Sequence, residues 1–202
     1  MSSKRALDVL LSGAGLVVSS PLWALVALAI KIEDGGPVFY SQPRVGAGGQ
    51  SFDAMKFRSM VPNAEQGVGP VQAVEHDPRV TRVGGLLRAT AMDELPQLWN
   101  IFRGDMSFVG PRALRPEEIE VDSRGARIPL DAIPGFAERI TVPPGLTGIA
   151  QIYARRDVSR RQKFRFDRLY IRRRSLLLDV RLILVSFWIT FRGTWEARDR
   201  KY

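Results

Sequence analysis

The sequence predicts an α/β fold that is mostly helical, and three features of the chain lead to that prediction. Residues 9–30 carry no charge and predict a long apolar helical segment. Two β-prone runs around a glycine-rich turn predict a small β-hairpin, and two basic, amphipathic segments near the end predict interfacial helices. We therefore expect a membrane hairpin in residues 1–32, a central domain in 33–158, and interfacial helices in 159–202 that complete that domain.

The composition limits the chemistry that this chain can perform. Its 202 residues are 45% apolar and 25% charged, which provides enough apolar material for a folded core. The sequence has no cysteine, so disulfides, cysteine-ligated zinc, iron–sulfur clusters and thiol catalysis are excluded. A single histidine, His76, argues against a Ser–His–Asp triad and histidine-rich metal sites. Any catalysis must therefore rest on carboxylates and basic side chains.

The net charge of +9 is concentrated near the end of the chain. Residues 1–153 hold 15 Lys and Arg against 16 Asp and Glu, whereas residues 154–202 hold 15 against 5. A basic segment with interleaved aromatic residues suits an anionic surface, either phospholipid headgroups or nucleic acid. The alternative is an arginine-rich face that is simply solvated.

The uncharged N-terminal segment favours the membrane over nucleic acid. As a straight helix of 22 residues it would be about 33 Å long, enough to cross the hydrocarbon core. Ser20 and Pro21 lie in its middle, where proline removes a backbone hydrogen bond and serine can bond the freed carbonyl. Both flanks are basic, so we expect a helix–break–helix that enters and leaves on the cytoplasmic face. A kinked single-pass anchor and a cleaved signal peptide are the alternatives.

The middle of the chain contains a hairpin, helices and loops. Residues 38–42 and 51–60 are β-prone and flank the glycine-rich turn at 46–49, which predicts the β-hairpin. The remaining segments are predicted from periodicity and from their Gly and Pro content: helices around 83–90, 93–102 and 116–123, and loops at 61–78 and 133–147.

The C-terminal part is predicted to form two amphipathic helices. Residues 159–174 interleave arginines with aromatic and aliphatic residues, and Ser175 is placed to cap a second helix that ends at Phe191. The uncharged stretch 182–191 is too short to span a bilayer. We expect its aromatic residues, among them Phe187, to lie in the membrane interface. The alternative is that these apolar residues belong to the core.

The candidate chemistry centres on the adjacent carboxylates Asp93 and Glu94. Thr90 and Asp93 have capping-box spacing, and Pro96 fits a first turn, so we expect a helix to start here. The helix dipole and unpaired backbone N–H groups would keep Asp93 ionised, as an attacking carboxylate must be. Since adjacent helical residues point about 100° apart, one carboxylate could attack phosphorus while the other helps to hold Mg²⁺. Acidic pairs are common at helix starts, so this pair alone is a weak signal.

Basic residues near the pair suit phosphate oxygens. Arg88 precedes it by five residues, and Arg112 follows a tight turn after it. Lys56 and Arg58 lie on the predicted hairpin. Ordinary surface ion pairs are the alternative for each of these residues taken singly.

The motifs in this order resemble the bacterial sugar transferases, also called monotopic phosphoglycosyl transferases. The resemblance covers nearly the whole chain, including the apolar hairpin with Ser20 and Pro21. Its further motifs are residues 36–39 (GPVF), 56–60 (KFRSM), 77–84 (DPRVTRVG), 93–100 (DELPQLWN), 104–112 (GDMSFVGPR) and 144–148 (PGLTG), closed by Gln151. Each motif is weak alone, but together they are highly specific. The length matches the minimal catalytic form of that family.

The resemblance implies a two-step transfer at the cytoplasmic face of a bacterial inner membrane, by a monotopic protein in contact with phospholipids. Asp93 would attack the β-phosphate of a UDP-sugar and release UMP, and polyprenyl (undecaprenyl) phosphate would then displace Asp93 to give a polyprenyl-diphospho-sugar. Glu94 would bind Mg²⁺. Contacts to substrate phosphates or nucleotide are expected from Lys56, Arg58, Arg88, Gln97, Arg112 and Arg155. The sugar, the polyprenol length, the glycoconjugate pathway and whether the protein is a homodimer stay open.

The chain departs from the family pattern in two places. Pro143 stands where the family usually has a basic residue, and residues 153–157 replace an Asn-Gly-Arg-like stretch, so the correspondence of Arg155 depends on spacing. Both departures concern substrate identity rather than the reaction. The competing hypotheses are a non-catalytic membrane-surface module that recruits a partner, and a nucleic-acid-binding protein, although no nucleic-acid motif is present. Release of UMP from a UDP-sugar separates the enzyme from both.

Overall fold

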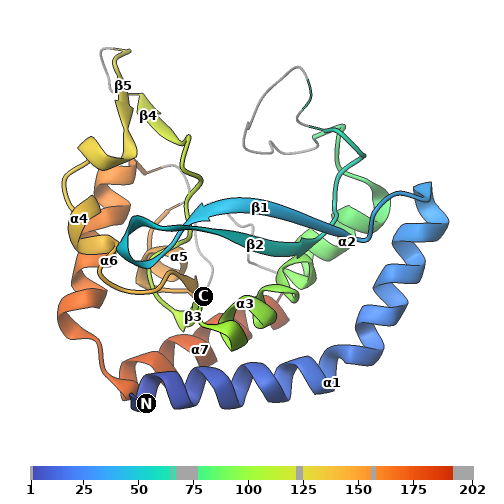
Figure 1. The fold of residues 1–202 in the computed structure, drawn as a ribbon, viewed down its shortest axis with the longest axis horizontal. Helices are drawn as coiled ribbons and strands as arrows, with labels where there is room; N and C mark the ends of the chain where they lie inside the picture. Colours follow the sequence, from blue (N-terminus) through green and yellow to red (C-terminus); the bar gives the residue numbers. More distant parts are fainter. Residues whose placement is uncertain (1, 65, 67–76, 122–124, 156–157, 193–202) are drawn as a thin grey trace.

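The structure is a computed structural model that describes residues 2–64, 66, 77–121, 125–155 and 158–192. Its elements are mostly helices, with three two-stranded sheets among the described residues. Figure 1 shows the long first helix running along one side of the molecule and then bending to follow a second side, with the other elements enclosed by the bend. The prediction of a mostly helical α/β chain with small sheets is confirmed.

Helix α1 spans Ser3–Asp34, and it begins at Ser2 as N-cap and ends at Gly35 in a left-handed conformation. It is long and apolar enough to cross a membrane. Pro21 lies inside it, so the predicted break between two helices is instead a bend within one continuous helix (Figure 1). The hydroxyl of Ser20 donates to the carbonyl of Val17 at 2.8 Å. Proline has no N–H for that carbonyl, and Ser20 takes over the lost bond, which keeps the chain helical.

The predicted hairpin is confirmed by strands β1 (Phe39–Val45) and β2 (Ser51–Phe57), which pair antiparallel. They are joined through the 3-10 turn η1 (Ala47–Gly49), in which two glycines adopt positive φ. Tyr40 lies opposite Lys56 in the register, and Arg44 lies opposite Phe52. Opposed residues share a face of a sheet, so Tyr40, Gln42 and Arg44 are on the same face as Lys56.

The expected helix over 93–102 is divided in the structure. Helix α2 (Arg82–Ala89) ends at Thr90, a 3-10 turn η2 (Met92–Glu94) follows, and α3 (Gln97–Arg103) begins only after Pro96. Ala91 has a left-handed backbone with φ of 54°, which reverses the chain between α2 and η2. The capping box predicted at Thr90 is therefore wrong, because its hydroxyl donates backwards to carbonyls of α2.

The helix predicted at 116–123 is also wrong over 116–121, and residues 122 and 123 lie outside the described residues. Strand β4 (Ile119–Val121) lies there and pairs antiparallel with β5 (Arg127–Pro129), since two β-branched residues alternate with a glutamate and find a partner strand. The segment predicted as a loop at 133–147 contains a short helix α4 (Phe136–Arg139) and strand β6 (Gly145–Thr147), after the 3-10 turn η3 (Leu130–Ala132). Of the loop predicted at 61–78, residues 65 and 67–76, including His76, lie outside the described residues.

Strand β3 (Ser107–Val109) pairs parallel with β6 and depends on glycine. A Cβ at Gly145 would lie 2.0 Å from the backbone nitrogen of Gly110, so only glycine permits the two chains to approach this closely. The pairing of β3 with β6 positions the loop that leads to Arg112. The backbone of Arg112 forms an isolated parallel β-bridge with Gly145.

The two C-terminal helices are confirmed as α6 (Arg160–Arg173) and α7 (Leu176–Phe191), capped by Ser159 and Ser175, and they follow the short helix α5 (Ile149–Tyr153). One side of α7 joins the core, where Leu182 and Ile189 pack with the buried Tyr170 of α6. The other side is exposed, and Leu177 and Phe191 keep 81% and 77% of their surface. The alternative that the apolar residues of this segment belong to the core therefore holds for one side of α7 only. Residues 193–202 of the basic segment lie outside the described residues.

Candidate active site

Asp93 and Glu94 lie in the short turn η2, beneath the hairpin strand that carries Lys56. The ammonium nitrogen of Lys56 is 2.5 Å from a carboxylate oxygen of Glu94 and 3.8 Å from one of Asp93. The side chains of all three residues are mostly buried. A single lysine thus lies against both carboxylates, whereas the sequence led us to expect that Lys56 contacts substrate phosphate.

Asp93 has an unusually high affinity for a proton. Burial raises the pKa of Asp93 to about 6; Lys56 and Arg88 oppose the rise and the neighbouring Glu94 adds to it. The expectation that a helix dipole would stabilise the charged form is wrong here, because η2 is a single 3-10 turn and desolvation dominates. At pH 7 roughly nine tenths of such a carboxyl is ionised. Asp93 is therefore a charged but poorly solvated group, which favours nucleophilic attack.

The pKa of Glu94 is lowered by its surroundings, in contrast to that of Asp93. Burial alone would raise the pKa of Glu94, but the charges of Lys56 and Arg112, with the short hydrogen bond from Lys56, hold it down at about 2. Arg44 adds to the same effect. The two neighbouring carboxylates are thus driven apart in proton affinity, and such a separation suits two different roles in one reaction.

Sequence reasoning missed two polar residues on the hairpin face that Lys56 occupies. Arg44 donates to the side-chain oxygen of Gln42 at 2.5 Å and to the carbonyl of Ala113 at 3.1 Å. Burial lowers the pKa of Arg44 to about 10, and the nearby Arg112 contributes. The signal that could have found these residues is the strand alternation 40, 42, 44 opposite Lys56, which can be used only after the hairpin register is known.

Two of the predicted arginines act on the carboxylates from other elements. Arg88 is in the last turn of α2, and its charge favours the ionised form of Asp93. Arg112 is exposed, and its charge favours the ionised form of Glu94. Arg139 holds the carbonyl of Arg112 while it pairs at 2.8 Å with the buried Asp167. Breaking a buried pair of this kind is costly, so the Arg112 backbone is firmly placed.

The other predicted site residues lie in different surroundings. Arg58 keeps only 6% of its surface exposed and binds Asp34 and the carbonyls of Pro37 and Met60. Gln97 is the buried first residue of α3, and Arg155 is exposed just beyond α5. Arg58 therefore serves the packing between α1 and the hairpin in this structure, whereas Lys56 faces the carboxylates.

The carboxylate pair is suited to a magnesium ion that arrives with a phosphate substrate. Among the residues that the structure describes, no group of three or more His, Cys, Asp or Glu side chains is placed to hold a metal ion. Mg²⁺ is typically bound by one or two carboxylates together with substrate phosphates and water. Asp93 and Glu94, whose pKa is lowered, match that donor set.

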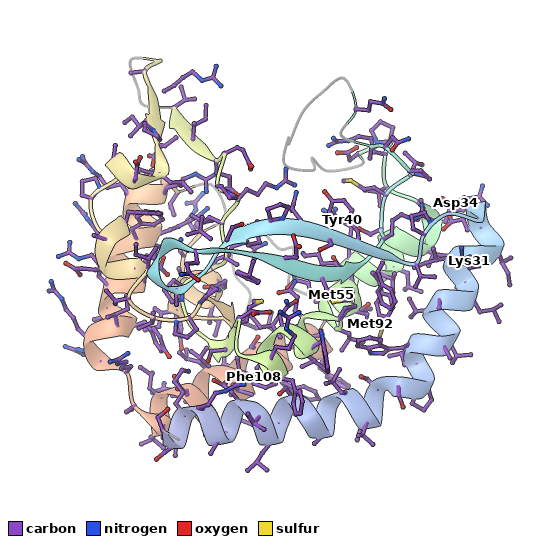
Figure 2. The ribbon with its side chains drawn as sticks, viewed as in Figure 1. Lys31, Asp34, Tyr40, Met55, Met92 and Phe108 are labelled. Carbon is purple, nitrogen blue, oxygen red and sulfur yellow. The ribbon has the colours of Figure 1, made fainter. Side chains whose placement is uncertain are left out.

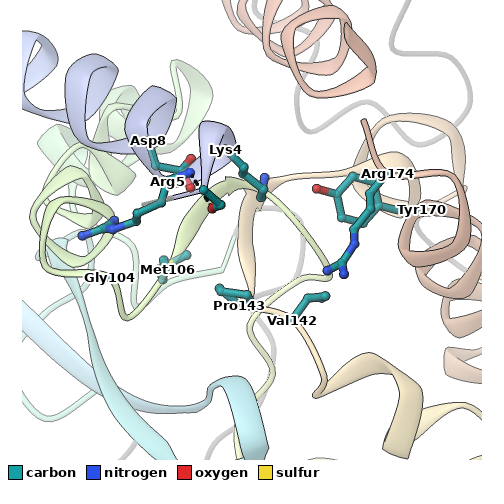
Figure 3. A pocket seen from close by; sticks show the side chains of 10 residues that line it. Lys4, Arg5, Asp8, Gly104, Met106, Val142, Pro143, Tyr170 and Arg174 are labelled. Carbon is teal, nitrogen blue, oxygen red and sulfur yellow. Dashed lines mark hydrogen bonds between the residues drawn. The ribbon is translucent and has the colours of Figure 1, made fainter. Parts of the chain in front are cut away.

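A cavity lies elsewhere, at the start of α1. It has a volume of about 180 Å³ and includes Met106 and Val142 in its lining. Figure 3 shows Lys4, Arg5 and Arg174 around it. Lys4 binds Asp179 at 2.8 Å, and Arg5 donates to two carbonyls at the end of α3, so these two cations anchor α1 to the domain. Asp93 is not part of this cavity.

Comparison with known proteins places these features in a family. The family model described as bacterial sugar transferase matches residues 1–193. The chain is 38% identical over 195 residues to the exopolysaccharide production protein ExoY of Sinorhizobium fredii, covering 90% of this chain and 82% of that protein. It is 42% identical over 186 residues to a UDP-glucose:undecaprenyl-phosphate glucose-1-phosphate transferase of Caulobacter vibrioides, covering 90% and 67%. It is 41% identical over 183 residues to a UDP-N-acetylgalactosamine-undecaprenyl-phosphate N-acetylgalactosaminephosphotransferase of Aeromonas hydrophila, covering 89% and 41%.

Proposed function

This chain belongs to the bacterial sugar transferase family, and on that premise we propose that it transfers a sugar 1-phosphate from a UDP-sugar to undecaprenyl phosphate. Relatives that cover most of this chain are named for that reaction. The observation that carries the proposal is the Asp93–Lys56–Glu94 cluster, because it places a cation suited to phosphate oxygens beside a poorly solvated carboxylate. The chain is thus a phosphoglycosyl transferase rather than a recruitment module or a nucleic-acid-binding protein.

The proposed chemistry has two displacements at one phosphorus atom. A carboxylate oxygen of Asp93 attacks the β-phosphorus of the donor, a new P–O bond forms, and the bond to the bridging oxygen breaks so that UMP leaves. A phosphate oxygen of the lipid acceptor then attacks the same phosphorus, and the Asp93 carboxylate is released with its electron pair. The product is undecaprenyl-diphospho-sugar. The rise in the pKa of Asp93 to about 6 supports this role, because a desolvated carboxylate is a stronger nucleophile yet is still ionised at neutral pH.

The surrounding cations supply what phosphoryl transfer chiefly needs, which is positioning and charge neutralisation. We assign Lys56, Arg88 and Arg112 to the donor phosphates because their positive charges act on the carboxylates from a strand, a helix and a loop. Glu94 would hold Mg²⁺ together with the diphosphate. When bound, that ion neutralises charge on the phosphate oxygens. Glu94 also fixes the ammonium group of Lys56, which limits its reorganisation during the reaction.

The exposed apolar surfaces fit a protein that works at a membrane. Several large apolar side chains of α1 are exposed, as are those on one side of α7; they are Leu10, Val17, Val18, Leu25, Ile32, Leu177, Leu184, Phe187 and Phe191. Exposure on this scale is unfavourable in water and favourable in lipid. We infer that α1 enters the bilayer, bends and leaves on the cytoplasmic face of a bacterial inner membrane, while α7 lies in the interface. Asp93 would then stand near the headgroups, where a lipid phosphate can reach it.

A donor panel tests the proposed function and identifies the sugar. Purified enzyme in phospholipid nanodiscs is incubated with Mg²⁺, undecaprenyl phosphate and one UDP-sugar at a time, including UDP-glucose and UDP-N-acetylgalactosamine. We expect UMP release that depends on both the lipid acceptor and one class of donor. The matched control is Asp93→Asn protein in the same nanodiscs. If no donor yields more UMP than this control, the proposal is wrong.

A further inference from the structure

The carboxyl end of α1 is held by an ion pair to the hairpin strand that carries Lys56. Arg58 donates from Nη1 to a carboxylate oxygen of Asp34 at 2.7 Å, and its Nη2 binds the other oxygen. The same guanidinium donates to the carbonyls of Pro37 at 2.6 Å and Met60 at 3.0 Å. Figure 2 shows Asp34 where the end of α1 meets the segment leading to β1. Because Arg58 directly follows β2, the pair fixes the end of the strand two residues from Lys56.

A second carboxylate in the same turn holds the start of α2. Glu33 accepts hydrogen bonds from the backbone N–H groups of Arg82 at 2.7 Å and Val83 at 3.2 Å. These N–H groups have no partner within their own helix, and a carboxylate at this end also interacts favourably with the helix dipole. The last turn of α2 carries Arg88. Adjacent residues of α1 thus hold the two elements that bring Lys56 and Arg88 to Asp93.

Apolar packing supports the same connection. The second half of α1 contributes Val26 and Ile30 to a buried cluster that includes residues of β2, α2 and η2. Four residues in or packed against that cluster are direct sequence neighbours of site residues: Phe57 beside Lys56, Leu87 beside Arg88, Met92 beside Asp93, and Leu95 beside Glu94. A shift of α1 would therefore be transmitted to the segments that carry Lys56, Arg88 and the two carboxylates, because packed interiors do not deform freely.

We propose that Glu33 and Asp34 are positioning residues that set the distances of Lys56 and Arg88 from Asp93. Arg58 acts in this scheme through Asp34 and not through a phosphate. The role in turnover rests on the proposed function, because it concerns the rate at which Asp93 attacks the donor. Since α1 is the helix proposed to enter the bilayer, the contacts of Glu33 and Asp34 also fix the site relative to the membrane plane. A displacement of about 1 Å in a catalytic constellation can cost up to roughly 100-fold in rate.

Single-turnover kinetics separates positioning from simple stabilisation. Full-length enzyme in nanodiscs is mixed with its UDP-sugar without acceptor, and the UMP burst is followed. The amplitude counts correctly folded sites, and the rate constant reports attack within each site. The variants are Asp34→Asn and Glu33→Gln. The matched control is Glu138→Gln, which removes a carboxylate that pairs with Arg168 at 2.8 Å between α4 and α6.

We expect at least a 10-fold lower rate constant in Asp34→Asn, a smaller decrease in Glu33→Gln, and an unchanged amplitude in both, with the control like the wild type. A reduced amplitude with a normal rate constant would show a purely structural role and overturn the proposal. A normal amplitude together with a normal rate constant in both variants would also overturn the proposal.

A second measurement reports the position of Lys56 without any turnover. A carbodiimide couples an amine to a carboxylate only when the two are in contact, and Lys56 and Glu94 are 2.5 Å apart. Peptide mass spectrometry then gives the yield of the Lys56–Glu94 amide. We expect a several-fold lower yield in Asp34→Asn and no change in Glu138→Gln. Equal yields in all proteins would refute the positioning role. If wild-type enzyme gives no UMP burst, the proposed function fails, and this yield alone decides the positioning.

Discussion

Replacing Lys56 by methionine removes the cation that faces both carboxylates while it keeps much of the side-chain volume. Lys56 lies 3.8 Å from Asp93, and a pair of unit charges at that distance interacts by about 4 kcal/mol at the effective dielectric constant of a protein site. At about 1.4 kcal/mol per pKa unit, the upper limit for the resulting rise in the pKa of Asp93 is about 3 units. Arg88 remains and the vacated site admits water, so we expect a rise of about 1 to 2 units.

The sign of this effect can be checked with a pH profile. Asp93 must be ionised to attack, so activity rises with pH through its pKa, which is about 6 in the wild type. In Lys56→Met the acid limb of the single-turnover rate should move toward pH 7–8, about 1 to 2 units higher, and the alkaline plateau should fall as well because a phosphate contact is lost. At pH 7 the combined loss should be about 100-fold or more.

The pH profile also distinguishes this reasoning from a role of Lys56 in substrate binding alone. Loss of a phosphate contact lowers the rate by one factor at every pH and leaves the limb where it was. Lys56→Arg serves as the control, since it retains a positive charge but changes the geometry; its limb should stay near pH 6. A Lys56→Met limb that also stays near pH 6 would refute the electrostatic coupling between Lys56 and Asp93.

Four further outcomes are expected. Asp93→Asn should fold normally and lose at least roughly 10³-fold in turnover, about 4 kcal/mol of barrier; near-normal turnover would remove Asp93 from the nucleophile role. EDTA should abolish activity and Mg²⁺ should restore it, whereas full activity in metal-stripped enzyme would contradict the assignment to Glu94. Gly145→Ala should reduce the free energy of unfolding by about 2–3 kcal/mol because its Cβ meets backbone, while Gly85→Ala meets nothing within 4 Å and should not destabilise. A cysteine in place of Ser3 should be labelled only from the cytoplasmic side in cells, and periplasmic labelling would refute the same-face topology.

The sequence correctly predicted the elements whose ends are set by nearby residues, such as a capping serine or a glycine-rich turn. Ser175 caps α7 as expected, and the glycine turn closes the hairpin. The helix predicted at 116–123 failed because pairing with a partner strand outweighed helix propensity. The start predicted at Thr90 failed because Ala91 adopts a left-handed conformation that spacing alone does not reveal.

The sequence indicated several residues of the candidate site, but it missed Gln42 and Arg44 and could not predict the electrostatics. The ordered motifs brought together Lys56, Arg88 and Arg112 with the carboxylate pair, although none of these residues is significant alone. The raised pKa of Asp93 comes from burial by segments distant in sequence, which no local pattern encodes. Arg58 lies two positions from Lys56 in the motif, yet its partner Asp34 is 24 positions away on α1. Such pairings become visible only in three dimensions.

The central claim is that the carboxylate of Asp93 carries the sugar phosphate between the two substrates. Enzyme mixed with its UDP-sugar in the absence of lipid acceptor, quenched rapidly and digested, can be examined by peptide mass spectrometry. We predict that the peptide containing Asp93 gains the mass of one phospho-sugar, and that added undecaprenyl phosphate removes it. A modification on any other residue, or transfer to the lipid with no protein adduct at any quench time, would contradict this account.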